Sequence, residues 1–190
     1  MPLIAIRQAA RGVNIGQWLM TERPEPKEYR SLSRQREYTC VRLLLAQMYP
    51  DADATVSYEA SGRPLLSTGD NISISHSQNY CCIITSPVYN VAIDIEEISS
   101  RVDRISSRLL RSDEQAPTLR HRIIHWCAKE TLYKFYSKEC LGLQDIRIEP
   151  FDLDQDCGQG VITAENIKRS CKLDVHYCID ADKIITYCYA

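Results

Sequence analysis

The chain has 190 residues, of which 44% are hydrophobic and 25% are charged, and its formal net charge is -2 at pH 7. This length holds one large domain or two small halves, and this composition is typical of a globular protein with an ample core. A net charge so close to zero gives no electrostatic basis for general nucleic-acid binding, although it does not exclude a local basic patch.

Nine cysteines are scattered along the chain without a C-x-x-C pair. This pattern argues against a zinc ribbon or a thioredoxin-like motif. Most lie among apolar neighbours, as Cys81 and Cys82 do, so we expect buried thiols in a reducing compartment. The apolar run from Pro2 to Ile6 is too short for a signal peptide, and no stretch reaches the length of a membrane span. These features predict a cytoplasmic protein without a membrane partner.

In chain order, the first part of the sequence predicts strands around one basic helix. Apolar residues from Leu32 to Met48 recur at helical spacing with arginines between them, whereas Pro24 and Pro26 indicate a loop. The expected strands cover residues 4–6, 13–19, 55–59, 71–76, 81–86 and 91–96, the loop covers 21–27, and the helix covers 29–48. These elements form an α+β half.

The second part offers a similar order of elements. A polar connector is expected at 98–104, a short helix at 105–110, a long helix at 118–138, and strands at 146–149, 161–163, 173–178 and 184–189. No residue-level repeat accompanies this order, so a pseudo-twofold relation is an architectural inference. The predicted fold class is α+β, with two similar halves at residues 1–97 and 98–190.

One predicted strand carries two carboxylates, Asp94 and Glu96, on the face opposite its apolar side chains, because side chains alternate along a strand. Two carboxylates on one face repel each other, and this arrangement is most stable in water or around a metal ion. Two oxygen donors suit Mg²⁺, which completes its shell with water and phosphate oxygens. The simpler alternative is an edge strand with a solvated acidic face.

The long predicted helix adds charged residues of both signs. One of its faces is expected to carry Ile123, Cys127, Glu130 and Lys134. The carboxylate of Glu130 and the ammonium of Lys134 would therefore project together. Such a pair is also an ordinary surface contact that stabilises a helix by about 0.2–0.5 kcal/mol. The helix alone therefore does not identify a site.

Other patterns have less support. His121 and His125 have a spacing that zinc can use, but Arg122 stands where the H-E-x-x-H motif has Glu. Ser75 and His76 are neighbours on a predicted strand, so their side chains point to opposite faces and cannot easily form the hydrogen bond of nucleophilic catalysis. No G-x-S-x-G, P-loop or G-x-G-x-x-G sequence occurs.

Four separated segments have an order and spacing that together are specific. They are Gly62-Arg63-Pro64, Asn-Ile-Ser-Ile-Ser-His-Ser at 71–77, Ile-Asp-Ile-Glu at 93–96, and Trp-Cys-Ala-Lys-Glu-Thr-Leu-Tyr-Lys at 126–134. The set resembles the 4'-phosphopantetheinyl transferases of the larger, surfactin-synthetase-activating type. Weaker similarity at 36–38 and 109–114 extends the resemblance over most of the chain.

The resemblance implies a holo-[acyl-carrier-protein] synthase type of enzyme. Such enzymes transfer the phosphopantetheine arm of coenzyme A to a serine of an apo acyl or peptidyl carrier protein and release 3',5'-ADP. The family fold has two similar α+β halves with the active site in the cleft between them, in a monomeric pseudo-dimer. By position, Asp94, Glu96 and Glu130 would hold Mg²⁺ against the pyrophosphate, with Lys134 near the leaving group. Glu130 would also accept the serine proton, directly or through water.

The resemblance also assigns residues that bind coenzyme A. They are Arg36, Gly62, Arg63, Pro64, Ser75, His76, Lys129 and Lys134. Arg36 and His76 match positions that contact the 3'-phosphate region. Arg63 replaces the more usual Lys near the adenine, which keeps the charge and adds a planar face that can stack. Outside this context, Arg36 is a helix-surface charge and His76 a strand-end histidine.

The chain departs from the family pattern in three ways. Ala92 replaces the usual Gly before Ile-Asp, which adds a methyl group that would crowd a close backbone approach. The upstream basic segment matches poorly, so Arg30, Arg34 and Arg42 are not assigned. The chain is also short for this type.

Two alternatives to the transferase belong to other classes. One is a noncatalytic homologue that binds coenzyme A or a carrier protein, against which the presence of all three acidic residues and Lys134 argues. The other is a different magnesium phosphotransferase or nucleotide hydrolase, for which no phosphate-cradling glycine loop is present.

Overall fold

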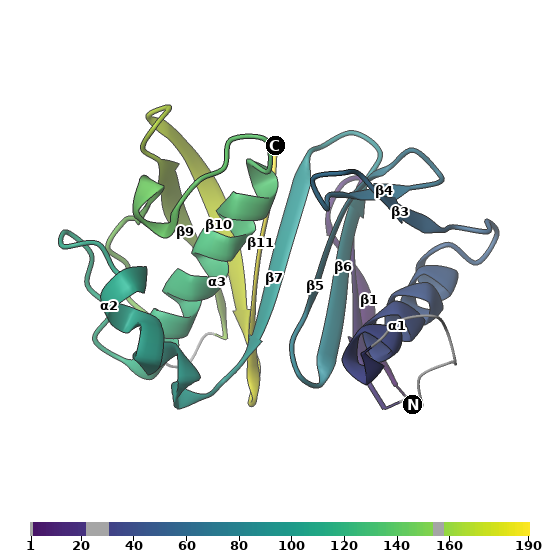
Figure 1. Cartoon of the computed structure of the whole chain (residues 1–190), viewed down its shortest axis with the longest axis horizontal. Helices are drawn as coiled ribbons and strands as arrows, with labels where there is room; N and C mark the ends of the chain where they lie inside the picture. Colours follow the sequence, from purple (N-terminus) through teal and green to yellow (C-terminus); the bar gives the residue numbers. More distant parts are fainter. Residues whose placement is uncertain (1, 22–30, 154–157) are drawn as a thin grey trace. The chain divides into compact units, whose positions relative to one another are not determined.

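The computed structural model describes residues 2–21, 31–153 and 158–190 (Figure 1). Most of the predicted loop at 21–27, the first two residues of the predicted helix over 29–48, and Cys157 lie outside the described residues. The chain divides into unit 1, which comprises Met1–Val91 with Tyr189–Ala190, and unit 2, which comprises Ala92–Cys188. The sequence predicted a boundary after residue 97. The observed boundary follows Val91, at the other end of the strand that was predicted at 91–96.

Unit 1 is an antiparallel sheet covered by one long helix. The sheet has the order β1-β2-β6-β5, formed by β1 (Leu3–Ala10), β2 (Val13–Leu19), β6 (Tyr80–Ser86) and β5 (Asn71–His76). Helix α1 (Leu32–Met48) packs against β2 and β6. Gly16 in β2 permits this close approach, because a Cβ atom there would lie 2.7 Å from Met48 Sδ.

A short antiparallel hairpin follows α1 in unit 1. It consists of β3 (Val56–Tyr58) and β4 (Pro64–Leu66). Its turn contains Gly62 with φ +85°, a left-handed conformation that favours glycine. The strand at 55–59 was predicted, but β4 was not, because β4 has only three residues and follows closely on the turn at Gly62.

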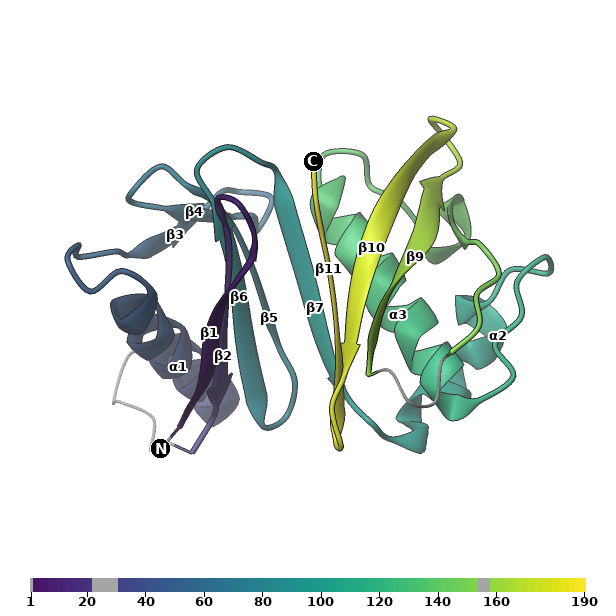
Figure 2. The ribbon, with the colours of Figure 1, turned by 180° about the vertical axis from the view of Figure 1, so that it is seen from behind.

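Unit 2 is a five-stranded sheet with α3 packed against it. The sheet order is β7-β11-β10-β9-β8, formed by β7 (Val91–Glu97), β11 (Lys183–Tyr189), β10 (Cys171–Ile179), β9 (Gln159–Asn166) and β8 (Ile146–Ile148). Helix α3 (Leu119–Phe135) is capped by Thr118, whose side chain accepts a hydrogen bond from His121 N. Figure 2 shows α3 behind β9 and β10.

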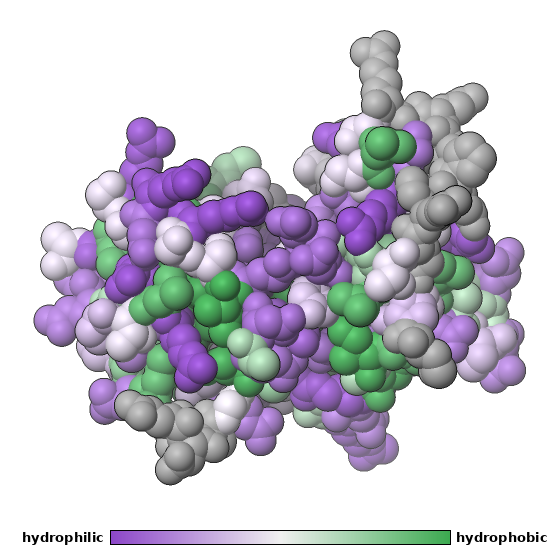
Figure 3. Space-filling view, turned by 90° about the horizontal axis from the view of Figure 1, so that it is seen from below, coloured by the Kyte–Doolittle hydropathy of each residue, from purple (hydrophilic) through white to green (hydrophobic). Residues whose placement is uncertain are grey.

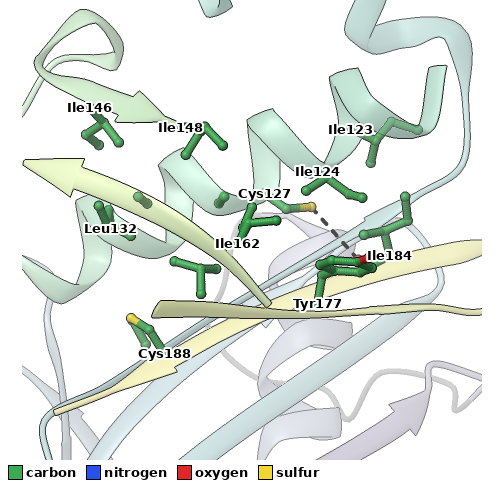
Figure 4. Packing of buried hydrophobic residues seen from close by; sticks show 14 of the residues in the cluster. Ile123, Ile124, Cys127, Leu132, Ile146, Ile148, Ile162, Tyr177, Ile184 and Cys188 are labelled. Atoms are coloured by element: carbon green, nitrogen blue, oxygen red, sulfur yellow. Dashed lines mark hydrogen bonds between the residues drawn. The ribbon is translucent and has the colours of Figure 1, made fainter. Parts of the chain in front are cut away.

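The core of unit 2 lies between α3 and the sheet. Figure 4 shows Ile124, Cys127 and Leu132 of α3 with Ile162, Tyr177 and Ile184 of the strands. The Cys127 thiol lies 3.9 Å from the carbonyl oxygen of Ile184. Five of the eight described cysteines are buried, in agreement with the predicted role of most thiols as small hydrophobes, whereas Cys140 and Cys171 are exposed.

Two predictions in unit 2 were wrong in detail. The connector expected at 98–104 forms a 3₁₀ helix, η1 (Ser100–Ile105), followed by α2 (Ser106–Leu109). The Ser99 side chain caps η1 by accepting a hydrogen bond from Arg101 N. Val102 is buried in the core, and the average polarity of the segment did not reveal this buried position. The long helix ends at Phe135 and not at 138. The mixed α+β class is confirmed, and the pseudo-twofold relation stays a prediction.

Apolar side chains are mostly inside both units. Hydrophilic side chains cover much of the face seen in Figure 3, with smaller apolar areas between them. Within the described parts of the chain, no helix has the length and apolar character needed to cross a membrane.

Two histidines of α3 are buried close together. His125 is 1% exposed, and its Nδ1–H donates to the carbonyl oxygen of His121 at 2.9 Å. The rings of His121 and His125 lie 5.2 and 5.4 Å from that of Phe151. Burial is the largest cause that lowers the pKa of His125, and the charge of Lys129 lowers it further, whereas Glu114 raises it. His125 is therefore a core residue held in its neutral form.

Acid is expected to destabilise the protein through His125. Because its pKa lies lower in the folded chain than the ordinary value near 6.5, the unfolded chain binds more protons as the pH falls below that value, and the free energy of unfolding decreases. One such group contributes at most about 1.4 kcal/mol per pH unit. Urea unfolding at about pH 7.5 and about pH 5.5 measures the loss. His125→Gln should reduce it, and an unchanged loss in that variant would contradict this origin.

Candidate active site

One stripe of α3 faces β7. Trp126, Glu130 and Lys134 recur every four residues and therefore lie along one side of the helix. The indole Nε1–H of Trp126 donates to Glu96 Oε1 at 2.8 Å, and Lys134 Nζ donates to Asp94 Oδ1 at 2.7 Å. Asp94 and Glu96 are two residues apart on β7, so both hydrogen bonds reach the same strand face.

Glu130 lies between these two contacts, one helical turn from Trp126 and one from Lys134. Burial is the largest cause that raises the pKa of the Glu130 carboxyl group, and the charges of Asp94 and Glu96 raise it further, whereas Lys134 lowers it. Since these interactions act over short distances, the structure brings Glu130 into the same region of unit 2 as Asp94 and Glu96.

The region is poor in positive charge. Burial is also the largest cause that raises the pKa of Glu96; the hydrogen bond from Trp126 and the charge of Lys134 lower it, while the charge of Asp94 raises it. Asp94 is 5% exposed, and its partner Lys134 also donates to the carbonyl oxygen of Ile93 at 3.0 Å. One ammonium group thus faces three carboxylates, which favours binding of a further cation.

The described residues do not form a closed metal site. Among them, no group of three His, Cys, Asp or Glu side chains is arranged to hold a metal ion. Lys134 and Trp126 each bind one oxygen of the strand carboxylates. The convergence of Asp94, Glu96 and Glu130 on one metal ion therefore stays a prediction. The chemistry of the donors still fits Mg²⁺, because all three are hard carboxylate oxygens on facing elements, with raised pKa values at Glu96 and Glu130.

Unit 1 contains a pocket of about 650 Å³ bordered by α1, the β3–β4 hairpin and β5. Its basic lining comes from Arg34, Arg42 and His76, and its aromatic lining includes Tyr38 and Tyr58. Apolar side chains complete the walls. This volume and lining suit a drug-sized ligand that combines an aromatic ring with an anionic group.

The family model of the 4'-phosphopantetheinyl transferase superfamily matches residues 90–188, just over half of the chain. The chain belongs to this superfamily. The matched segment contains the whole of α3 and the strand carboxylates that its stripe contacts. The sequence-based assignment to the superfamily is thus confirmed. No curated protein resembles the chain closely enough to count as a match.

Lys129 does not have the role that the superfamily resemblance suggested. Its side chain is 0% exposed, and Nζ donates three hydrogen bonds, to Glu114 Oε2 at 2.7 Å, Leu109 O at 2.8 Å and Leu143 O at 3.2 Å. An ammonium group has three donors, so all of them are used. The expectation that Lys129 binds coenzyme A is therefore wrong, and this lysine joins α3 to α2 and to η2 (Leu143–Asp145).

The substitution of Ala92 for the glycine usual in the superfamily is accommodated in unit 2. Ala92 is fully buried and belongs to the same hydrophobic cluster as Cys127 and Ala128 of α3. Its methyl group therefore contributes to the core.

The predicted coenzyme-binding residues of unit 1 divide into two groups. Gly62, Pro64 and His76 line the pocket, as do Arg34 and Arg42, which the sequence did not assign. The other three do not belong to the pocket lining, and each has its own surroundings. Arg36 donates to the carbonyl oxygen of Met20, Arg63 donates to Asn90 Oδ1 at 3.4 Å, and Ser75 is 7% exposed in β5. The assignments of Arg36, Arg63 and Ser75 to coenzyme binding therefore stay predictions.

A helical signal for the missed arginines was present. Arg34, Tyr38 and Arg42 are four residues apart and thus share one side of α1. Val41 and Leu45 of the predicted apolar stripe line the same pocket. The basic side chains of Arg34 and Arg42 could therefore have been predicted to lie beside the apolar stripe of the helix.

Proposed function

We propose that the chain is a Mg²⁺-dependent 4'-phosphopantetheinyl transferase that uses coenzyme A as donor and a serine of an apo carrier protein as acceptor. The observation that carries this proposal is the stripe of Trp126, Glu130 and Lys134 facing Asp94 and Glu96. It lies inside the segment matched by the superfamily.

The residues of this stripe have complementary roles in the proposed reaction. The serine oxygen forms a bond to the phosphorus of the phosphopantetheine group, while the bond from that phosphorus to 3',5'-ADP breaks. Asp94, Glu96 and Glu130 would hold Mg²⁺, which when bound neutralises charge on pyrophosphate oxygens. Lys134 supplies positive charge beside Asp94 for the departing phosphate. Glu130 accepts the serine proton, directly or through water.

The pocket of unit 1 is proposed to take the phosphorylated adenosine end of coenzyme A. Arg34, Arg42 and His76 supply the N–H groups that bind phosphate oxygens, and the tyrosine rings supply faces for the adenine. Arginine is suited to this role because its planar group binds phosphate with two parallel hydrogen bonds.

Intact mass measurement on a panel of apo carrier proteins tests the proposed function. Each carrier is incubated with the protein, coenzyme A and Mg²⁺, and parallel reactions omit coenzyme A or contain EDTA. At least one acyl or peptidyl carrier should gain one phosphopantetheine group on its serine in the complete reaction only. No adduct on any carrier, together with measurable binding of coenzyme A, would support a noncatalytic binding homologue instead. An undiminished adduct in EDTA would contradict the dependence on Mg²⁺.

A further inference from the structure

A carboxylate stands beside the basic side chains that line the pocket of unit 1. Glu37 of α1 places Oε2 at 3.3 Å from Nε2 of His76, which ends β5. Its other oxygen, Oε1, accepts a hydrogen bond from Ser33 Oγ at 2.9 Å, one helical turn earlier. Glu37 and His76 both line the pocket. Ser33, Glu37 and His76 therefore form a chain of polar contacts that ends at the pocket wall.

The contact between Glu37 and His76 is expected to contribute little to the stability of the fold. The side chains of His76 and Glu37 are 43% and 26% exposed, and ion pairs with this exposure contribute little to stability. A carboxylate beside an anion site also opposes binding of an anion by its charge. Its position beside His76, with Arg34 and Arg42 as the other charged groups in the lining, therefore suggests an effect on how the imidazole meets a ligand.

We propose that Glu37 is a positioning residue that orients His76 toward the phosphate monoester of the bound nucleotide. This inference rests on the proposed function, because it takes the phosphorylated adenosine of coenzyme A as the occupant of the pocket. The Glu37 carboxylate lies at ion-pair distance from Nε2 and so leaves Nδ1, which has no partner among residues that the structure describes, as the ring nitrogen for a ligand. A carboxylate that fixes an imidazole in this way is a general means of setting which nitrogen faces a bound group.

Geometry gives this arrangement a defined consequence for specificity. A phosphate oxygen binds at Nδ1 when that nitrogen carries a proton, and the ring then lies between two anions, Glu37 and the phosphate. A donor that lacks the 3'-phosphate gains nothing from the orientation of His76. Glu37 should therefore increase the preference for coenzyme A over 3'-dephospho-coenzyme A.

Calorimetric titration with both donors tests the inference. Glu37→Ala should weaken binding of coenzyme A about 10-fold and leave binding of 3'-dephospho-coenzyme A unchanged within about 2-fold. Glu37→Gln keeps an acceptor for Nε2–H and should retain most of the preference. In a His76→Ala background, Glu37→Ala should cause no further loss of affinity, because Glu37 favours binding only through His76. Glu59→Ala, which changes an exposed carboxylate outside the pocket lining, is the matched control.

The results separate this inference from the proposed function. Equal weakening for both donors, additive losses with His76→Ala, or tighter binding of coenzyme A by Glu37→Ala would overturn the role of Glu37. Carrier modification by the wild type together with any of these results would leave the transferase proposal standing. Failure of the wild type to bind coenzyme A would overturn both. Thermal melting of each variant verifies that the fold is retained.

Discussion

Asp94→Asn is expected to lower the turnover of carrier modification by about 100-fold or more while the protein stays folded. The substitution removes a charged oxygen donor without a change in side-chain size. It also replaces the carboxylate that Lys134 contacts at 2.7 Å with a neutral amide, so the ammonium is held less strongly, while its hydrogen bond to the carbonyl oxygen of Ile93 remains. Initial rates of adduct formation, measured by intact mass at saturating coenzyme A, give the turnover.

Glu97→Gln is the matched control for this substitution. Glu97 is on the same strand, but an odd number of positions from Asp94 places it on the opposite face. The control should keep wild-type turnover, and both variants should melt as cooperatively as the wild type. Near-normal turnover of Asp94→Asn would contradict the assignment of Asp94.

Lys129→Met is expected to reduce the free energy of unfolding by about 3–5 kcal/mol. The substitution deletes the buried partner of Glu114 and leaves that carboxyl group without its ammonium in a site where both side chains are 0% exposed. Glu114 also accepts hydrogen bonds from Arg111 N at 2.8 Å and Ile148 N at 2.7 Å. The loss therefore affects the turn before α3 and strand β8. Urea unfolding followed by circular dichroism measures it.

Lys138→Met provides the comparison for Lys129→Met. Lys138 is exposed just beyond the end of α3, and a substitution there should change the free energy of unfolding by less than about 0.5 kcal/mol. If Lys129→Met is as stable as this control and loses affinity for coenzyme A, the original ligand-binding assignment of Lys129 would be restored.

Local patterns explain why much of the fold could be predicted. Strands β2, β5 and β6 are short segments that carry β-branched or aromatic residues and have clear ends, and α1 and α3 carry apolar residues at helical spacing. η1 was missed because its stability depends on Val102 reaching a core built by distant segments. The end of α3 depends similarly on tertiary context, since local propensity continues beyond Phe135.

The parts of the site that could be predicted are those in which strand or helix periodicity alone determines the direction of the side chains. Alternation placed Asp94 and Glu96 together, and helical spacing paired Glu130 with Lys134. Tertiary contacts were needed for the rest. Both Lys129 and Glu130 follow Trp126 closely, yet only the positions of Glu114 and β7 determine which of them is buried in an ion pair and which faces the strand carboxylates.

Calorimetric titration of Mg²⁺ into the protein saturated with coenzyme A tests the central claim most directly. The wild type should bind one ion per chain, and Glu130→Gln should weaken this binding about 10-fold or more, because it removes a charged donor from the helix side of the site. Melting curves of the two proteins should coincide closely enough to exclude unfolding as the cause. Wild-type affinity for Mg²⁺ in Glu130→Gln would contradict the claim that α3 and β7 together form the metal-dependent active site.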